Sequence, residues 1–172
     1  MRIIGGRFKG KKILQPKNKQ TRPLKDLTKE SIFNILNHSN KFKISVENSI
    51  VLDLFSGVGS FGLECLSRGA RHVTFVENYS GVLPTLKNNL NNLNISEKYE
   101  IIEEDLMSNF PIKKIRQKFN IIFLDPPYKE KRLPNIIDDI FQKKILNKNG
   151  VIVIHRHKKE NDEFSKNFKI LD

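Results

Sequence analysis

The sequence predicts an α/β protein with a doubly wound, mostly parallel sheet. From residue 49 onward, short runs of Ile, Val, Leu and Phe alternate with stretches of helical periodicity. These apolar runs are continuous rather than alternating, as expected of strands that helices bury on both faces. A glycine-rich segment directly follows the first of them. Together these observations indicate a Rossmann-like fold.

A basic N-terminal extension over residues 1–43 is expected to precede the main domain over residues 44–172, within one compact unit. Glycines and short apolar runs predict a hairpin over residues 1–14, and a polar linker follows over residues 15–25. The extension thus consists of a hairpin, a linker and one helix.

The helix of the extension is expected over residues 26–38, because apolar residues recur there at helical spacing. Asp26 or Thr28 is expected to cap its start. Its predicted apolar face consists of Leu27, Ile32, Phe33, Ile35 and Leu36.

The main domain is expected to alternate strands with helices. The predicted strands cover residues 50–55, 72–77, 99–104, 119–124, 151–154 and 168–171. The predicted helices cover residues 59–68, 80–93, 132–146 and 159–166. Phe33 and Phe61 are expected in the core, and Cys65 is expected as a small buried residue.

Positive charge is concentrated in the extension. The chain has a formal net charge of +12, and residues 1–43 contain twelve Lys or Arg against two Asp or Glu, a net of +10 that leaves +2 for the rest. A general compositional bias would not place nearly all the excess in one quarter of the chain. Such a segment attracts a polyanion, so it favours a nucleic-acid partner.

The composition argues against several other classes. No apolar run approaches the roughly 18 residues that span a bilayer. Cys65 is the single cysteine, which excludes a disulfide framework. His155 and His157 have no evident third ligand beside them, which argues against a metal site. We therefore expect a cytoplasmic protein without a metal or a membrane contact.

Gly57, Gly59 and Gly62 follow the first predicted strand with the spacing G-x-G-x-x-G. Glycine suits this position because the chain turns sharply and a ligand must approach bare backbone. Glu77 ends the next strand twenty residues after Gly57, where a carboxylate can bind ribose hydroxyls. This pattern fits both NAD and S-adenosylmethionine.

Asp53 favours S-adenosylmethionine over a dinucleotide. Its carboxylate precedes the glycines and can meet a positively charged methionine group, whereas it would repel a pyrophosphate. The cofactor-binding candidates at these two strand ends are Asp53, Phe55, Gly57, Gly59, Glu77 and Asn78. Asp105 and Leu106 follow the third strand, where a carboxylate and a backbone amide can bind an adenine ring.

Asp125-Pro126-Pro127-Tyr128 directly follows an apolar strand and is the strongest chemical signal. An exocyclic amine on a base is a poor nucleophile, because its lone pair is delocalised into the ring. The Asp125 carboxylate and the Pro126 carbonyl can accept its two hydrogens and free that lone pair. Prolines fix this backbone, and Tyr128 offers a face for base stacking. The motif predicts methylation of an amino group.

The order of these features resembles the bacterial small-subunit ribosomal RNA guanine-N2 methyltransferases, which are class I enzymes dependent on S-adenosylmethionine. The resemblance covers nearly the whole chain. It is carried by Arg2-Ile3-Ile4-Gly5-Gly6, Thr21-Arg22-Pro23, residues 30–36, 52–59 and 62–70, Phe75-Val76-Glu77 and Asp125-Pro126-Pro127-Tyr128. The N-terminal segment and Ser67-Arg68-Gly69-Ala70 are its more specific parts.

This resemblance implies S-adenosylmethionine as cofactor near Gly57, Gly59, Glu77 and Asp105, with the target base at residues 125–128. It implies a monomer that methylates a guanine N2 of the 966 type in 16S ribosomal RNA, in an assembling small ribosomal subunit. The RNA contacts that we expect in the extension are Arg2, Arg7, Lys9, Lys11, Lys12 and Arg22.

The chain departs from this family in three places. Leu24 and Leu27 stand where the family has Thr and Arg, so those contacts to cofactor or RNA are not expected. His-Arg-His follows the fifth strand at residues 155–157 in place of an acid. The family continues into a closing strand, whereas this chain stops at Asp172; two explanations are open, that this edge of the sheet is missing or that the sequence is shortened.

Three other functions fit part of the pattern. A DNA or RNA adenine-N6 methyltransferase would use the same Asp-Pro-Pro-Tyr chemistry, although no separate DNA-recognition domain is evident. A dehydrogenase would leave that motif without a purpose. A non-catalytic RNA-binding module would keep the fold and lack the reaction.

Overall fold

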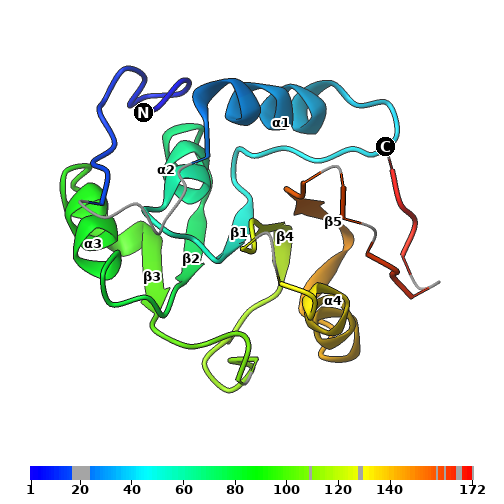
Figure 1. Ribbon diagram of the computed structural model, residues 1–172. Coiled ribbons are helices and arrows are strands. Elements are labelled where there is room, and N and C mark those ends of the chain that lie inside the picture. The colour runs from blue at the N-terminus through cyan, green and yellow to red at the C-terminus, as the bar shows by residue number, and fades with distance from the viewer. Residues whose placement is uncertain are drawn as a thin grey trace.

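A parallel sheet in the order β3-β2-β1-β4-β5 forms the centre of the computed structural model (Figure 1). Its strands are β1 (Ile50–Leu54), β2 (His72–Val76), β3 (Tyr99–Ile102), β4 (Phe119–Leu124) and β5 (Leu146–Ile154). The structure describes residues 1–16, 24–108, 110–127, 130–157, 159–160, 162–165 and 168–171. Each neighbouring pair of strands is parallel, as the sequence predicted.

Helices cover both faces of this sheet. The helices are α1 (Asp26–His38), α2 (Ser60–Ser67), α3 (Leu83–Asn91) and α4 (Leu133–Gln142), with a short 3-10 helix, η1 (Ser96–Lys98), before β3. Val51 of β1 joins the core shared with the first three helices, whereas Leu52 joins the core shared with α4. The doubly wound arrangement predicted from the sequence is therefore confirmed. No helix in the described part of the chain is long and apolar enough to span a membrane.

Helix α1 has the predicted bounds but buries a different face. Lys29, Phe33 and Leu36 are buried, whereas Leu27 is 76% exposed and Ile35 is 60% exposed. The prediction for Leu27 and Ile35 was wrong because the buried stripe is centred on a lysine, which a hydrophobicity pattern counts as polar. The predicted caps were also wrong, since the N-cap residue is Lys25 and no side chain caps the helix.

The end of the chain also differs from the prediction. Among the described residues of 159–171 there is neither the expected helix nor the expected strand. Phe168 instead packs edge-on against Phe141 of α4, with ring centroids 5.6 Å apart. This apolar contact takes the place of strand pairing. The fifth strand begins at Leu146, earlier than expected, because α4 ends at Gln142.

The N-terminal extension forms the expected antiparallel turn and packs on the main domain. Arg2 and Lys12 form an antiparallel bridge, and the Gly10 N–H donates to the Ile3 carbonyl at 2.9 Å. Ile3 and Ile13 are 1% exposed and belong to the same core as the sheet. The extension and the sheet therefore share one core.

A buried ionic cluster joins the first residues of the chain to α1 and α2. Lys29 and Glu64 are fully buried and lie 3.8 Å apart, and Lys29 Nζ donates to the Arg2 carbonyl. Glu64 also accepts hydrogen bonds from the Ile4 N–H at 2.8 Å and from Arg68 Nε at 2.8 Å. Buried charges are tolerated when they are paired and hydrogen-bonded in this way.

Phe33 and Phe61 lie in the core as predicted. The Phe33 and Phe61 rings stack at 5.3 Å, and Phe61 stacks on Phe123 of β4 at 4.1 Å. Cys65 is buried, as expected. This column of rings links α1 through α2 to the sheet directly beneath the candidate site.

Candidate active site

The turn between β1 and α2 brings bare backbone to the carboxyl edge of the sheet. Phe55 (φ 58°), Gly57 (φ 55°) and Gly59 (φ 83°) adopt left-handed conformations in close succession, which glycine tolerates best. A Cβ atom on Gly62 would lie 2.2 Å from the Phe75 ring. These glycines therefore serve a sharp turn and a close helix–sheet contact, as in nucleotide-binding folds.

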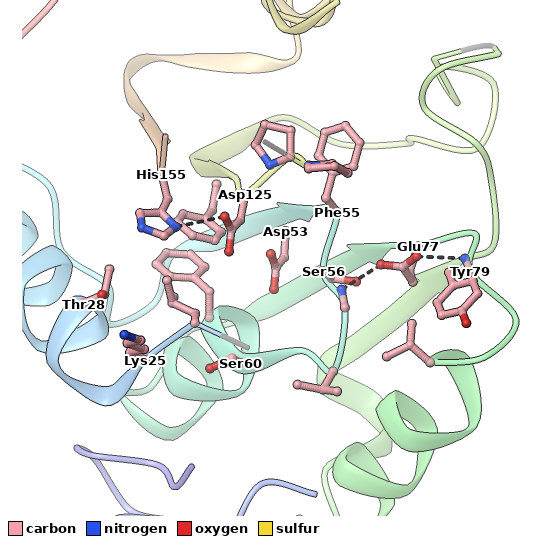
Figure 2. Close-up of a pocket in the computed structure, with 18 of the residues that line it drawn as sticks. Lys25, Thr28, Asp53, Phe55, Ser56, Ser60, Glu77, Tyr79, Asp125 and His155 are labelled. Carbon is pink, nitrogen blue, oxygen red and sulfur yellow. Dashed lines mark hydrogen bonds and ion pairs between the residues drawn. The ribbon is translucent and has the colours of Figure 1, made fainter. Parts of the chain in front are cut away.

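Glu77 is the first residue after β2 and is bonded to this turn (Figure 2). Its Oε2 accepts a hydrogen bond from the Gly57 N–H at 2.8 Å, and its Oε1 accepts one from the Tyr79 N–H at 2.8 Å. Asn78 lies next to it and is exposed. The second strand end is thus bonded to the glycine turn, with the carboxylate at the site.

Asp53 is a buried acid at the base of the site. Its side chain lies in β1, the residue is 1% exposed, and its Oδ2 accepts a hydrogen bond from the Gly62 N–H at 2.9 Å. Burial raises the pKa of Asp53 from 3.8 to about 8; the hydrogen bond from Gly62 opposes this shift, and the charges of Asp125 and Glu77 add to it. A cation placed in the site would favour the ionised carboxylate.

Asp125 and His155 are the first residues after two neighbouring strands. Strands β4 and β5 pair in parallel with Leu124 opposite Ile154, so the two side chains emerge at the same edge. His155 Nδ1 lies 2.9 Å from Asp125 Oδ1, as Figure 2 shows, and both side chains are about one quarter exposed.

These strand ends line one cavity of about 320 Å³ (Figure 2). It is lined by eight of the predicted site residues: Asp53, Phe55, Gly57, Glu77, Asn78, Asp125, Pro126 and Pro127. Leu24, Lys25 and Thr28 line it from the start of α1 and the two residues before it. The cavity therefore brings together the cofactor candidates and the candidate base-binding motif.

Three of the predicted cofactor residues do not line the cavity. The Asp105 carboxylate accepts hydrogen bonds from its own turn, from Ser108 Oγ at 2.7 Å and the Met107 N–H at 2.9 Å. These two bonds lower the pKa of Asp105, Ser108 more strongly. Leu106 is buried in the core beside α4, and Gly59 packs against helix α3. The predicted Tyr128 and Arg22 lie outside the described residues.

Sequence reasoning missed Arg156, which holds the backbone after Asp125. Arg156 Nη1 donates to the Pro127 carbonyl at 3.2 Å, and Nη2 donates to the Glu130 carbonyl. Arg156 Nε donates to Asp162 Oδ2 at 2.8 Å, and these contacts keep the pKa of Arg156 raised, with the hydrogen bond to Asp162 as the largest cause. The signal was the His-Arg-His sequence after β5, which the sequence analysis considered as a metal site and as a departure from the family's acid, but not as a source of contacts to the Asp125 turn.

The predicted RNA-binding cations of the extension lie on the surface. The described members are all exposed: Arg2, Arg7, Lys9, Lys11 and Lys12. The Arg7 guanidinium lies 4.3 Å from the Phe8 ring centroid. Ser60 Oγ, which lines the cavity, donates to Met1 Sδ at 3.2 Å. The extension therefore begins beside the cavity and carries exposed positive charge.

Known proteins resemble the whole of this chain. The family model called Conserved hypothetical protein 95 matches residues 1–172. The chain belongs to this family. Ribosomal RNA small subunit methyltransferase D of Buchnera aphidicola is 35% identical over 169 residues, covering 98% of this chain and 84% of the relative. The enzyme of that name from Haemophilus influenzae is 33% identical over 159 residues, covering 92% and 79%.

Solved structures agree with this family membership. A proposed methyltransferase of Escherichia coli, yhhF, superposes with a TM-score of 0.83 at 27% identity, covering 100% of this chain and 90% of that one. A proposed methylase of Haemophilus influenzae superposes with a TM-score of 0.76 at 31% identity, covering 100% and 90%. The predicted class I methyltransferase fold and family are confirmed, and S-adenosylmethionine is the cofactor that such methyltransferases use.

Proposed function

We propose that this protein transfers a methyl group from S-adenosylmethionine to the exocyclic N2 of a guanine in 16S ribosomal RNA, at a site of the 966 type. The observation that carries the proposal is that one cavity is lined by Asp53, Gly57 and Glu77 and also by Asp125 and Pro126. The names of the relatives support ribosomal RNA of the small subunit as the substrate.

The cavity fits the cofactor in charge and in size. Its volume of about 320 Å³ falls within the usual range for small-molecule sites. Asp53 is a buried carboxyl whose pKa is raised by burial and by neighbouring acids, so a positively charged ligand would stabilise its ionised form. In our proposal Asp53 faces the charged methionine end and Glu77 binds the ribose hydroxyls. When bound, the cofactor supplies an electrophilic methyl group.

The Asp125 turn suits an amino group. The Asp125 carboxylate and the Pro126 carbonyl are two acceptors on adjacent residues, and both residues line the cavity. Arg156 donates a hydrogen bond to the carbonyl of Pro127. This contact holds the turn and does not use the Pro126 oxygen. Two acceptors on an amine would localise its lone pair on nitrogen. Positioning and electrostatics then supply most of the acceleration. Stacking of the base on Tyr128 stays a prediction.

The basic extension is our proposed RNA surface. Its exposed cations lie on the same segment as Met1, which contacts the cavity residue Ser60. Phosphates held there would direct the target base toward Asp125. We propose an assembling small ribosomal subunit as the partner, bound by a monomer in the cytoplasm.

An adenine-N6 methyltransferase is the second candidate, because the Asp125–Pro126 acceptors would serve that amine equally well. The segments that resemble the guanine-N2 family most specifically, Arg2-Ile3-Ile4-Gly5-Gly6 and Ser67-Arg68-Gly69-Ala70, favour guanine. A dehydrogenase is not supported, because the Buchnera aphidicola and Haemophilus influenzae relatives, which match most of the chain, are named ribosomal RNA methyltransferases. A non-catalytic RNA-binding module would bind the same RNA without turnover, so an activity assay separates it from the enzyme.

The test uses labelled S-adenosylmethionine and small ribosomal subunits from a strain that lacks the orthologous enzyme. We expect N2-methylguanosine in the digested RNA by mass spectrometry; N6-methyladenosine would replace our proposal with the second candidate. Asp125→Ala should lower the transfer rate about 100-fold or more and leave cofactor affinity within about threefold. Asp138→Ala, on α4 away from the cavity, is the matched control. Normal turnover by Asp125→Ala would refute the catalytic assignment.

A further inference from the structure

We propose that His155 is a positioning residue, which works as a neutral Nδ1–H donor to Asp125 and turns the other carboxylate oxygen toward the target amine. This inference rests on the proposed function and adds to it a residue that neither the motif nor the relatives' names assign.

A backbone hydrogen bond and a side-chain contact both hold His155 beside Asp125. The His155 N–H donates to the Leu124 carbonyl at 2.9 Å, which continues the β4–β5 ladder to the residue before Asp125. The imidazole Nδ1 then lies 2.9 Å from Asp125 Oδ1. Both residues line the cavity (Figure 2). Because two adjacent strands hold the pair, the imidazole has little freedom to leave the carboxylate.

The contact assigns different roles to the two oxygens of Asp125. Oδ1 accepts from the imidazole, so Oδ2 is the oxygen left to accept from an amino group in the cavity. A neutral histidine can donate from only one of its two nitrogens. The bond to Asp125 therefore requires the Nδ1–H tautomer, in the way that a carboxylate partner commonly fixes the tautomer of a histidine.

The charges around His155 explain why its neutral form is the active one. The ionisable groups that line the same cavity are Lys25 before α1, Asp53 from β1, Glu77 and Tyr79 after β2, and Asp125 after β4. Arg156 follows His155 in the chain and pairs with Asp162. A protonated imidazole would add a cation to a cavity that has to receive the positively charged cofactor, and it would make Asp125 a weaker acceptor. The neutral form therefore suits both the cofactor and the acceptor role of Asp125.

Two substitutions test the orienting role of His155. His155→Asn places an amide donor near the position of Nδ1. His155→Ala removes the donor. Loss of one hydrogen bond to a charged group corresponds to about a 10- to 100-fold change in rate. We therefore expect His155→Ala to lose about 10- to 100-fold in single-turnover methyl transfer at pH 8, with cofactor affinity nearly unchanged.

The comparison of the two variants is decisive. His155→Asn should keep its rate within about threefold of wild type at pH 8, because its amide replaces the donor. His38→Asn, an exposed histidine on α1, should keep the wild-type rate. An unchanged rate in His155→Ala, or a loss in His155→Asn as large as that in His155→Ala, would overturn the inference. If His155→Ala does not fold, the rate of His155→Asn still decides it.

A measurement without RNA separates this inference from the proposed function. The chain has four histidines, so long-range proton–nitrogen NMR with His155→Asn as reference identifies the His155 signal. We expect the Nδ1–H tautomer in the wild type and the Nε2–H tautomer, which free histidine prefers, in Asp125→Ala. The Nε2–H tautomer in the wild type would overturn the inference even if methylation is observed. Absence of methylation with the Nδ1–H tautomer present would overturn the proposed substrate instead.

Discussion

Asp53→Asn tests the buried acid on which our cofactor proposal depends. Burial raises the pKa of Asp53 to about 8 in the folded chain, against 3.8 for the unfolded reference. Between these two values the folded state holds a proton that the unfolded state has lost. The free energy of unfolding contributed by Asp53 is therefore fully present below pH 3.8 and is lost as pH rises through 8.

The magnitude follows from this difference in proton binding. Each pH unit within the window changes the free energy of unfolding by about 1.4 kcal/mol. Asparagine keeps an oxygen for the Gly62 N–H and does not titrate. The stability of Asp53→Asn relative to wild type should therefore rise by about 1.4 kcal/mol per pH unit from pH 5 to pH 7, and level off above pH 8.

Urea unfolding followed by circular dichroism at pH 5, 6, 7, 8 and 9 measures this difference. Asp138→Asn, which removes a half-buried carboxylate from α4, serves as the control and should differ from wild type by no more than about 0.5 kcal/mol. A difference between Asp53→Asn and wild type that does not change with pH would refute the reasoning, because Asp53 would then carry its charge in the folded protein.

The same substitution has a second consequence for the cofactor. Because we propose that Asp53 faces the positive methionine end, binding should favour the carboxylate and release a proton near pH 7. Calorimetry in two buffers of different ionisation enthalpy measures that proton. We expect wild-type affinity to rise with pH up to about 8, and Asp53→Asn to bind more weakly without this rise. Equal proton release by both proteins would contradict the contact.

Two further predictions concern the extension. In Gly6→Ala the residue would keep a φ of +70° and its new Cβ would lie 1.9 Å from a carbonyl oxygen of α2. Gly10 has a φ of +89°, but a Cβ there would meet open space. Urea unfolding should therefore show a free energy of unfolding lowered by about 1 kcal/mol in Gly10→Ala and by more in Gly6→Ala. Equal losses would contradict the close docking. Replacing Lys9 and Lys12 by Ala should reduce the magnitude of the slope of log RNA affinity against log salt concentration by up to about 1.5. Lys143→Ala serves as the control. An unchanged slope in the double variant would mean that the RNA binds to another surface.

The central sheet could be predicted from the sequence because its signal is local. Val51, Leu52 and Leu54 are fully buried, and a strand buried on both faces leaves a continuous apolar run. The buried face of α1 could not be predicted in the same way. Lys29 is buried because Glu64 and the Arg2 carbonyl meet it there, and both partners are distant in sequence. A pattern of hydrophobicity along one helix carries no information about such partners.

The sequence could predict the place of a candidate site residue where that residue directly follows a strand. Glu77 and Asp125 are the first residues after their strands, and parallel pairing alone then brings them to one edge of the sheet. Asp105 is the third residue after β3, and by that point the chain has turned and its carboxylate is bonded within its own loop. His155 meets the same condition as Asp125, since it directly follows β5 beside β4. Glu77, Asp125 and His155 therefore reach the cavity because each directly follows its strand. The sequence places Asp105 in the same way after a strand over residues 99–104, but β3 ends two residues earlier, at Ile102, and that end could not be found from the apolar pattern.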